Sequence, residues 1–324
     1  MSKKLWMGIA AVAIVAIAAV GLFKTKSESL VTVAPQTVII GYRTHDLYAP
    51  VFVGIEQKIF EKYGLDVKTV QFASTNQLTD ALIGGSVDAA LGGVNIPLIL
   101  TIQDKSPGEL VAFSLVNETP VAPLAYLLVT PSSTIATIAD LRGKKVGAFQ
   151  GSTAQYLYRK TVSSFFKPEE AELVQMNPEL ELAALASGQV AAVIVLEPLA
   201  TIGQSQHTTR VLESGLFDKF VMPNFPNAAS VMAGRFKRER PDVAKALVEA
   251  TDETIDFINS HPAETRAAIA KFLPFEAGVL DSIRLPYFIK QTEIKLEPVQ
   301  QEADLLYNDK QLKKSVDVKG AFSL

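Results

Sequence analysis

The sequence predicts an α/β protein built from two doubly wound lobes, preceded by an apolar N-terminal helix. Three observations lead to this fold class. Strand-like and helix-like segments alternate along the chain, and one helix-to-strand pattern occurs twice. In addition, 324 residues with 48% hydrophobic content are more than one hydrophobic core usually organises.

The first element is an uninterrupted apolar run from Leu5 to Phe23, with Lys3 and Lys4 before it and Lys24 after it. At about 1.5 Å per residue the run covers roughly 28 Å, close to the thickness of the hydrocarbon core of a bilayer. It is typical of an export signal. Residues 1–24 are therefore expected to be either a cleaved signal peptide or a retained membrane anchor, and residues 25–36 a polar tether.

The first lobe is predicted to begin near Gln36. Strands alternate with helices here, and Gly64 ends the first helix. Such alternation favours a mostly parallel sheet. The expected strands are 37–42, 66–72 and 87–91, and the expected helices are 50–63, 77–83 and 96–101.

A second α/β unit starts after Pro131. Its predicted helices are 138–142, 153–166 and 179–186, and its predicted strands are 145–149, 173–176 and 190–196. The pattern Ala-Leu-x-x-Gly-x-Val-x-Ala occurs at residues 81–89 and again at residues 184–192, each time where a helix leads into a strand. This internal similarity favours two related lobes.

Two extended apolar stretches, 124–130 and 228–233, bracket the second unit and are interpreted as hinge crossovers. The chain after Gly234 is predicted to be helical at 242–259, 262–272 and 275–283, and to pack back on the first lobe. The expected division is a discontinuous lobe 1 of residues 37–127 plus 228–324, with lobe 2, residues 128–227, inserted between its parts.

The composition excludes several classes of site. The chain has no cysteine, so it can form no disulfide, thiolate metal site or cysteine nucleophile. His45, His207 and His261 lie far apart and form no spaced ligand pair. The formal net charge of −3 does not suit a nucleic-acid surface. We expect no metal, no cofactor and no nucleic-acid partner, and a monomeric protein.

Several short motifs in a fixed order resemble one family of proteins. In the first lobe they are Gly54-Ile55-Glu56, residues 60–67 (FEKYGLDV), Ala81-Leu82 and residues 85–90 (GSVDAA). In the second lobe they are residues 139–147 (ADLRGKKVG), Gly151-Ser152-Thr153 and Glu197-Pro198. Together, over residues 36–310, the set resembles the substrate-binding proteins of ABC transporters for nitrate, taurine, aliphatic sulfonates and the thiamine pyrimidine precursor.

The resemblance implies a type II periplasmic-binding-protein fold whose two lobes close on a small organic solute. It also implies an ABC transporter permease as the partner and a location outside the cytoplasm. Two positions depart from the family pattern: Ala191 replaces an acidic residue, and Leu196 stands where an aromatic residue commonly precedes the Glu-Pro pair. Both departures concern the solute, which the sequence leaves open among sulfonates, nitrate-like anions and pyrimidines.

Ligands of open α/β sheets bind beyond the carboxyl ends of the strands, so the candidate site consists of the polar residues that follow each strand. Ser152 and Thr153 open a helix, where free N–H groups attract an anion or cap the helix. Ser74 and Thr75 allow the same two interpretations. The candidate ligand-binding residues are Tyr42, Arg43, His45, Tyr48, Ser74, Thr75, Gly93, Asn95, Gln150, Gly151, Ser152, Thr153, Asn177 and Glu197.

The chemistry of these residues leaves the charge of the solute undecided. Glu197 could accept hydrogen bonds from an amine or an aminopyrimidine. Arg43 could bind a sulfonate or carboxylate with its guanidinium fork. Tyr42 and Tyr48 could stack on a planar solute or pack in the core.

We expect no catalytic residues. An enzyme of the same fold, acting on a small metabolite as a dehydratase does, is one alternative, because a fold alone does not determine function. No Gly-x-Ser-x-Gly elbow, phosphate-binding loop or zinc-binding helix supports that alternative. A receptor that signals without transport is a second alternative.

Overall fold

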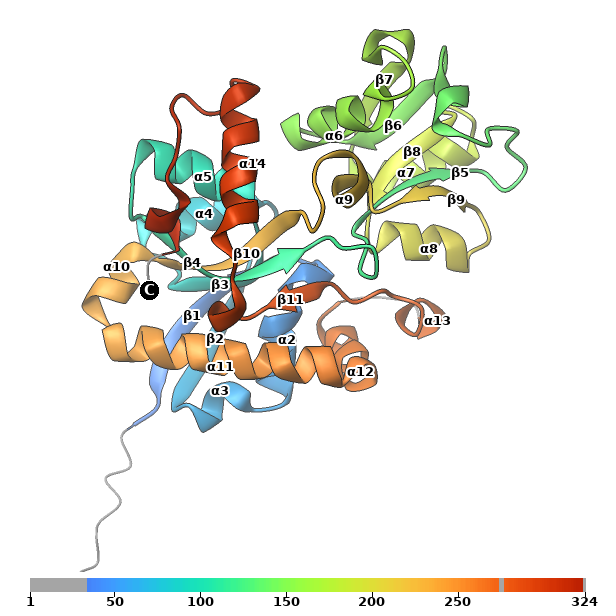
Figure 1. The fold of residues 1–324 in the computed structure, drawn as a ribbon. Helices are drawn as coiled ribbons and strands as arrows, with labels where there is room; N and C mark the ends of the chain where they lie inside the picture. Colours follow the sequence, from blue (N-terminus) through green and yellow to red (C-terminus); the bar gives the residue numbers. More distant parts are fainter. Residues whose placement is uncertain (1–33, 274–276, 323–324) are drawn as a thin grey trace, which may run out of the picture. The chain divides into compact units, whose positions relative to one another are not determined.

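The computed structural model describes residues 34–273 and 277–322, and within them two sheets with flanking helices (Figure 1). The predicted signal or anchor at residues 1–24, most of the tether and the start of the helix predicted at 275–283 lie outside the described residues. Within the described part of the chain, no helix has the length and apolar character needed to cross a membrane.

The first sheet has six strands in the order β11-β4-β10-β3-β1-β2. Strand β1 pairs in parallel with β2 and β3, whereas β10 runs antiparallel to both β3 and β4. The six strands are β1 (Gln36–Tyr42), β2 (Leu65–Gln71), β3 (Ala89–Asn95), β4 (Leu110–Asn117), β10 (Pro226–Ala233) and β11 (Tyr287–Ile289).

Helices cover both faces of this sheet, with α11 and α12 on one side and α5 and α14 on the other (Figure 1). The helical elements, with η for 3-10 turns, are η1 (Asp46–Tyr48), α2 (Ala49–Glu56), α3 (Ile59–Lys62), α4 (Thr75–Gly84), α5 (Ile96–Lys105), α10 (Gly234–Glu239), α11 (Pro241–Ser260), α12 (Pro262–Phe272), α13 (Ala277–Leu280), η4 (Gln291–Glu293), α14 (Leu296–Asn308) and η5 (Val318–Ala321).

The second sheet has five strands in the order β7-β6-β8-β5-β9. Strand β6 is parallel to β7 and β8, and β5 is antiparallel to β8 and β9. Its elements are β5 (Ala125–Val129), η2 (Ile138–Leu141), β6 (Lys145–Phe149), α6 (Ser152–Ser163), η3 (Pro168–Glu170), β7 (Glu172–Met176), α7 (Pro178–Ala186), β8 (Ala192–Leu196), α8 (Leu199–Ser205), β9 (Arg210–Ser214) and α9 (Leu216–Phe220).

The two sheets bury their side chains differently. Side chains of the first sheet belong to one large core. In the second sheet, successive residues of β8 point to opposite faces, so that Ala192 and Ile194 enter one core and Val193 and Val195 enter another. Strand β8 is buried on both faces, and this explains its unbroken apolar sequence.

The structure corrects parts of the predicted organisation. The stretches 124–130 and 228–233 are not crossovers, because they contain β5 and β10, which are central strands of the two sheets. The sheets are mixed rather than mostly parallel, since these same strands run antiparallel to their neighbours. The helix predicted at 50–63 is broken at Lys58, which has a φ of 54°. The break brings the ring of Phe60 against Gly54.

The polypeptide passes between the sheets through residues 118–124 and 215–225, and Glu118 joins these two connecting segments. Its buried carboxylate accepts hydrogen bonds from the backbone N–H groups of Leu124 at 2.8 Å and Ala125 at 2.6 Å. Its other oxygen accepts from the N–H of Asp218 at 2.8 Å. One side chain therefore holds the backbone of both segments in place.

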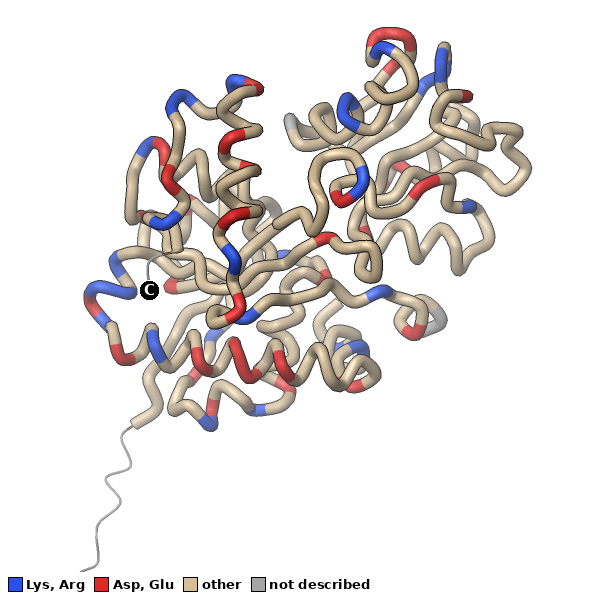
Figure 2. Tube along the Cα trace, in the orientation of Figure 1, with Lys and Arg blue, Asp and Glu red and all other residues tan. Residues whose placement is uncertain are grey.

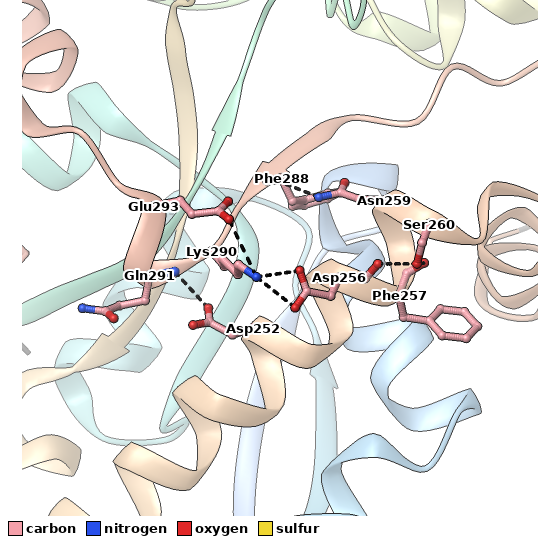
Figure 3. Close-up of polar contacts among 9 residues, drawn as sticks. All are labelled: Asp252, Asp256, Phe257, Asn259, Ser260, Phe288, Lys290, Gln291 and Glu293. Carbon is pink, nitrogen blue, oxygen red and sulfur yellow. Dashed lines mark hydrogen bonds and ion pairs between the residues drawn. The ribbon is translucent and has the colours of Figure 1, made fainter.

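The C-terminal part of the chain is fastened to α11 by polar contacts (Figure 3). Lys290 Nζ lies 2.8 Å from a carboxylate oxygen of Asp256, and the backbone N–H of Gln291 donates to Asp252. Asn259 donates to the carbonyl oxygen of Phe288 in β11. Figure 2 shows further acidic residues along α11. These contacts fix β11 at the sheet edge and thereby position the segment that precedes it, which carries Arg284.

Because Glu118 satisfies three buried N–H groups, Glu118→Ala should be strongly destabilising. Each buried donor left without a partner costs about 1–3 kcal/mol, so we expect a loss of at least about 3 kcal/mol of unfolding free energy in urea titrations. Glu169→Ala, which removes an exposed carboxylate, is the control and should change the free energy by less than about 0.5 kcal/mol. Equal stability of the two variants would contradict this role for Glu118.

Candidate functional site

Four predicted site residues lie together: Arg43 in the loop after β1, Tyr48 in η1, Thr75 at the start of α4 and Gly93 within β3. Arg43 Nη1 donates to Thr75 Oγ1 at 3.2 Å, and the hydroxyl of Tyr48 donates to the carbonyl oxygen of Gly93 at 3.1 Å. Arg43 and Thr75 both influence the Tyr48 hydroxyl, so the four residues form one cluster, which we call the Arg43 cluster. The sequence identified all four.

The absence of side chains at Gly92 and Gly93 makes this arrangement possible. A Cβ at Gly92, whose φ is +100°, would lie 2.0 Å from the carbonyl oxygen of Leu47, and one at Gly93 would lie 2.2 Å from the ring of Tyr48. Both approaches are shorter than any normal contact. The turn η1 can therefore rest directly on the backbone of β3.

The Arg43 cluster is polar and partly buried: Tyr48 is buried, whereas Arg43, Thr75 and Gly93 are half-buried. Burial raises the pKa of the Tyr48 hydroxyl, although the positive charge of Arg43 and the hydrogen bond with Thr75 oppose that rise. Tyr48 is therefore neutral at physiological pH and acts as a hydrogen-bond donor. Nε of Arg43 is buried and has no hydrogen-bond partner in the structure. This N–H group is available to an acidic or carbonyl group of a ligand.

Glu197 is at the centre of a second group of residues, at the carboxyl end of β8. It is 2% exposed, and its carboxylate accepts hydrogen bonds from the backbone N–H and the hydroxyl of Thr201, both at 3.1 Å. Tyr126 of β5 also interacts with Glu197 through its hydroxyl. Arg284 donates to the same hydroxyl at 3.2 Å, and its guanidinium lies 5.8 Å from the centre of the Tyr126 ring.

Burial, and after it the negative charge of Asp46, raise the pKa of Glu197 to about 7, although hydrogen bonds from Thr201 and Tyr126 oppose the rise. Asp46 belongs to η1 and Glu197 follows β8, so carboxylates associated with different sheets interact here. Glu197, Asp46, Tyr126 and Arg284 form what we call the Glu197 cluster. Near neutral pH its charge depends on what binds to it.

Asp46 is fully buried, and neither carboxylate oxygen has a hydrogen-bond partner in the structure. His45 Nδ1 lies 2.6 Å from Oδ1 of Asp46, yet the same nitrogen accepts the backbone N–H of Leu47 at 3.2 Å. One ring nitrogen cannot donate to the first group and accept from the second. The short contact pairs His45 electrostatically with Oδ1 of Asp46, and it leaves Oδ2 without a partner.

Three predicted residues have structural roles in the structure. Ser74 accepts the N–H of Gln77 at 3.2 Å, and Asn95 accepts the N–H of Leu98 at 3.0 Å, so both side chains cap helices. Tyr42 packs edge-on against Phe52 with ring centres 5.4 Å apart. The capping interpretation of Ser74 and the packing interpretation of Tyr42 agree with these contacts.

Apart from Glu197, the predicted residues of the second sheet do not join either cluster through any hydrogen bond found among the described residues. Gln150, Gly151 and Asn177 are exposed, and the side chain of Ser152 lies outside the described set. Thr153 lines a separate cavity of about 20 Å³, together with Pro97, Tyr156, Phe217, Phe225, Glu302, Leu306 and Gln311.

This cavity contains two buried polar groups without hydrogen-bond partners, the hydroxyl of Tyr156 and Oε2 of Glu302. Its volume is sufficient for one water molecule. Burial raises the pKa of Glu302 well above the ordinary value for a glutamate. Glu302 lies on α14 and Tyr156 on α6, so the cavity separates helices associated with different sheets.

The sequence did not single out Asp46, Tyr126 or Arg284. Asp46 lies within the loop that follows the first strand, so its acidic side chain between His45 and Leu47 was the available signal. Tyr126 lies in a stretch interpreted as a crossover. Arg284 is more than 150 residues from Tyr126 along the chain, and no local pattern indicates their contact. No group of three or more potential metal ligands occurs among the described residues.

Comparison with known proteins assigns the chain to a family. A profile described as the NMT1-like family matches residues 32–274. The chain belongs to the NMT1-like family. This NMT1-like protein is 26% identical over 233 residues to a protein of Brucella abortus named as a binding protein, and the match covers 71% of this chain and 69% of the relative.

A second relative is named as an aliphatic sulfonates-binding protein of Escherichia coli K12. It is 25% identical over 313 residues, 95% of this chain and 93% of its own. Among solved structures, the periplasmic aliphatic sulphonate binding protein from Escherichia coli matches with a TM-score of 0.71 at 23% identity, over 89% of this chain and 97% of that one. The NMT1-like protein thus has the mixed α/β fold of periplasmic binding proteins.

An enzyme also has this fold. The structure of the desulfurization enzyme DSZB matches with a TM-score of 0.67 at 15% identity, over 89% of this chain and 96% of that chain. At this identity the likeness concerns the fold alone, so function must be argued from the residues of the site.

Glu302 should give the protein a measurable pH dependence. The folded-state pKa is raised above the unfolded value of about 4.3, so the folded protein binds this proton more tightly than the unfolded chain does. Stability should fall as the pH rises above about 4.3, by at most about 1.4 kcal/mol per unit, until the folded-state pKa is passed.

Glu302→Gln should therefore have a flatter profile than the wild type and be more stable at pH 8, as measured by urea unfolding between pH 4 and pH 9. Glu297→Gln, in the exposed first turn of the same helix, is the matched control and should follow the wild type. Parallel profiles for Glu302→Gln and the wild type would show that the Glu302 carboxylate is solvated.

Proposed function

We propose that this NMT1-like protein is the extracytoplasmic solute-binding component of an ABC importer. Its relatives are named as binding proteins, including one for aliphatic sulfonates, and its fold is that of periplasmic binding proteins. The apolar run from Leu5 to Phe23 supports export and would act as a signal peptide or a membrane anchor. The partners we propose are a small organic solute and a transporter permease.

One observation carries this proposal. Buried polar atoms without hydrogen-bond partners occur in the loop that follows β1, namely Nε of Arg43 and both carboxylate oxygens of Asp46, and the charge of Asp46 influences Glu197 of the second sheet. Leaving such groups unpaired costs free energy, so folded proteins retain few of them without a role. A solute that contacted all three would restore the missing interactions and draw the sheets together.

The proposed mechanism is closure of two lobes about the connecting segments 118–124 and 215–225. The first sheet with its helices would form lobe 1, and the second sheet would form the inserted lobe 2, close to the division expected from the sequence. Glu118 would keep the two connecting segments together during closure, because it accepts hydrogen bonds from both. Closure about such segments is a common type of domain motion.

Arg43 is the residue proposed to bind the acidic group of a sulfonate, a nitrate-like anion or a carboxylate. Its fork-shaped guanidinium matches such groups, and Thr75 already orients one of its nitrogens. Tyr48 is placed beside it as a neutral donor. A planar pyrimidine remains a further candidate, for which Glu197 would be the acceptor.

An enzyme on the same fold is the second candidate, because DSZB has this fold. Nucleophilic catalysis by cysteine is excluded, since the chain has none. In the described site, His45 contacts Asp46 and the backbone of Leu47, and it activates no serine or threonine hydroxyl. A receptor that signals without transport would have the same site, and only its membrane partner would distinguish it.

Binding and compaction test the proposal together. Native mass spectrometry of residues 30–324, purified without refolding, should detect a retained small molecule, and X-ray scattering should show a smaller radius of gyration with solute than without it. Arg43→Ala should weaken the binding of ethanesulfonate at least tenfold, because a charge-assisted hydrogen bond contributes about 1.5–3 kcal/mol. Arg159→Ala, at an exposed arginine of α6, is the control.

A protein that retains no solute, binds none of a panel of sulfonates, carboxylates and pyrimidines, and keeps a constant radius of gyration would not be a solute receptor. In that case an enzymatic function would be the favoured candidate. Turnover of the same panel, followed by mass spectrometry, would then be the next measurement.

A further inference from the structure

Helix α14 of the first lobe and helix α6 of the second touch one another away from the connecting segments. Leu305 of α14 packs against a core of the second sheet, whereas its neighbour Leu306 belongs to the core of the first sheet. Directly after α14, Asp309 lies 3.9 Å from Lys160 of α6. Contacts of this kind are small beside the core of a lobe, so they can separate without unfolding either lobe.

The cavity that contains Glu302 lies at this contact, next to strand ends of both sheets. Thr153, in the first turn of α6, follows the end of β6, and Pro97, in the first turn of α5, follows the end of β3. Both residues line the same cavity of about 20 Å³. Ligands of α/β sheets bind beyond the carboxyl ends of strands. Docking of α14 on α6 therefore accompanies closure of the two lobes around a solute.

The docked contact buries a carboxyl group without a counter-charge. Glu302 is 3% exposed, and its Oε2 has no hydrogen-bond partner within the described part of the chain. Among the residues that line the cavity, the other titratable group is the hydroxyl of Tyr156. Burial, and after it the charges of Asp309 and Glu302, raise the pKa of this hydroxyl to about 12, although Arg159 opposes the rise. Tyr156 is therefore neutral at physiological pH and cannot balance an ionised Glu302.

The charged groups on the elements packed around Glu302 do not line its cavity. On α6, Lys160 pairs with Asp309, and on α5, Asp104 lies 4.0 Å from Lys314. Burial is the one cause found for the shifted pKa of Glu302. The other charged residues of α5, α6, α9, α14 and η5 near this contact are Lys105, Arg159, Asp218, Lys219, Glu297, Asp304 and Lys319. An ionised Glu302 in the docked contact would thus be a buried charge without a partner, which is costly.

We propose that Glu302 controls the docking of the two lobes, which stay docked while it carries a proton and separate when it ionises. This inference rests on the proposed function and concerns the regulation of the same receptor. A protonated Glu302 is neutral, and one water molecule in the cavity is enough to link it to the hydroxyl of Tyr156. An ionised Glu302 instead gains hydration when α14 moves away from α6.

The direction of the pH effect follows from the two states of Glu302. In separated lobes the carboxyl group is solvated and has its ordinary pKa of about 4.3, whereas burial in the docked lobes raises the pKa well above that value. The docked state binds the proton more tightly, so low pH favours docking. As the pH rises above about 4.3, the ratio of docked to separated molecules should fall by up to about tenfold per pH unit, until the docked-state pKa is passed.

The distance between two spin labels tests the inference without any solute. The chain has no cysteine, so Ser164→Cys beyond α6 and Asn308→Cys at the end of α14, both at exposed positions, direct labels to these sites alone. Pulsed electron paramagnetic resonance of the full-length chain in detergent should give one short distance at pH 5. A population at longer distance should grow towards pH 9, and the docked-to-separated ratio should fall at least tenfold.

Two changes on α14 assign that pH response. In Glu302→Gln the short distance should persist from pH 5 to pH 9, because the amide does not ionise. Glu297→Gln, at an exposed carboxylate in the first turn of the same helix, is the matched control and should respond as the labelled wild type does.

A third change weakens the docked contact itself. Leu305→Ala removes the side chain that packs on the second sheet, so the docked-to-separated ratio at pH 5 should fall at least threefold. Leu296→Ala removes a half-buried leucine of the same helix that packs on the first core, and it should keep the short distance. Identical distance distributions for these two variants would show that Leu305 does not hold the lobes together.

Calorimetric titration with ethanesulfonate connects docking to solute binding, because this probe is an anion throughout the range from pH 5 to pH 8. Glu302→Gln should bind it at least tenfold more tightly than the wild type at pH 8 and within threefold of the wild type at pH 5. Other titrating groups, including Glu197, are present in both proteins, so the comparison isolates Glu302.

A label distance that does not change with pH, or that changes equally in the wild type and in Glu302→Gln, would overturn the inference. Equal affinities of these two proteins for ethanesulfonate at pH 8 would also overturn it. If ethanesulfonate does not bind, the label distances alone decide. Failure of the proposed function is a separate result, since it requires that no solute is retained and that the radius of gyration stays constant with every compound of the panel.

Discussion

The arrangement of this protein depends on a single buried carboxylate between its two sheets. Glu118 directly follows β4 of the first sheet and accepts hydrogen bonds from N–H groups of the segment that enters β5 and of the start of α9. Its own N–H donates to the carbonyl oxygen of Phe225, just before β10. Both connecting segments between the sheets therefore hydrogen-bond to Glu118. The loops that carry the site residues are positioned relative to this residue.

Two buried carboxylates, those of Glu118 and of Asp46 in the Glu197 cluster, differ in how fully the protein hydrogen-bonds them. Burial raises the pKa of Glu118, but hydrogen bonds from backbone N–H groups oppose this effect, so the fold itself satisfies the carboxylate. At Asp46 this compensation is missing, because neither carboxylate oxygen has a hydrogen-bond partner within the described part of the chain and His45 makes only an electrostatic contact. Both residues are acids with almost no exposure, and they differ in whether the fold itself satisfies them. Unsatisfied groups that converge from different elements are a physical sign of a binding site.

The sequence predicted the local features well, because they depend on nearby residues. The bounds of β6 and α12 agree with the structure, and the repeated Ala-Leu-x-x-Gly pattern does join a helix to a strand in both sheets. Strands β4, β9 and β11 were not predicted, since their pairing partners are remote in the chain. The same limit applies to the site: Arg43, Tyr48 and Thr75 follow strand ends and Gly93 lies within the last part of β3, whereas the contact of Arg284 with Tyr126 depends on how α11 anchors the C-terminal segment.

The bare backbone at Gly92 and Gly93 also limits how the specificity of this protein can evolve. These positions form the surface beneath η1, and a side chain at either one would collide with Leu47 or Tyr48. Selection for a new solute therefore cannot act by adding groups there without moving the turn. In the proposed receptor, selection would act instead on residues of the loop that follows β1, such as Arg43 and Asp46. Substitutions there can change the charge of the site while the backbone stays in place. Within such a lineage the backbone beneath η1 should persist longer than the identity of the solute.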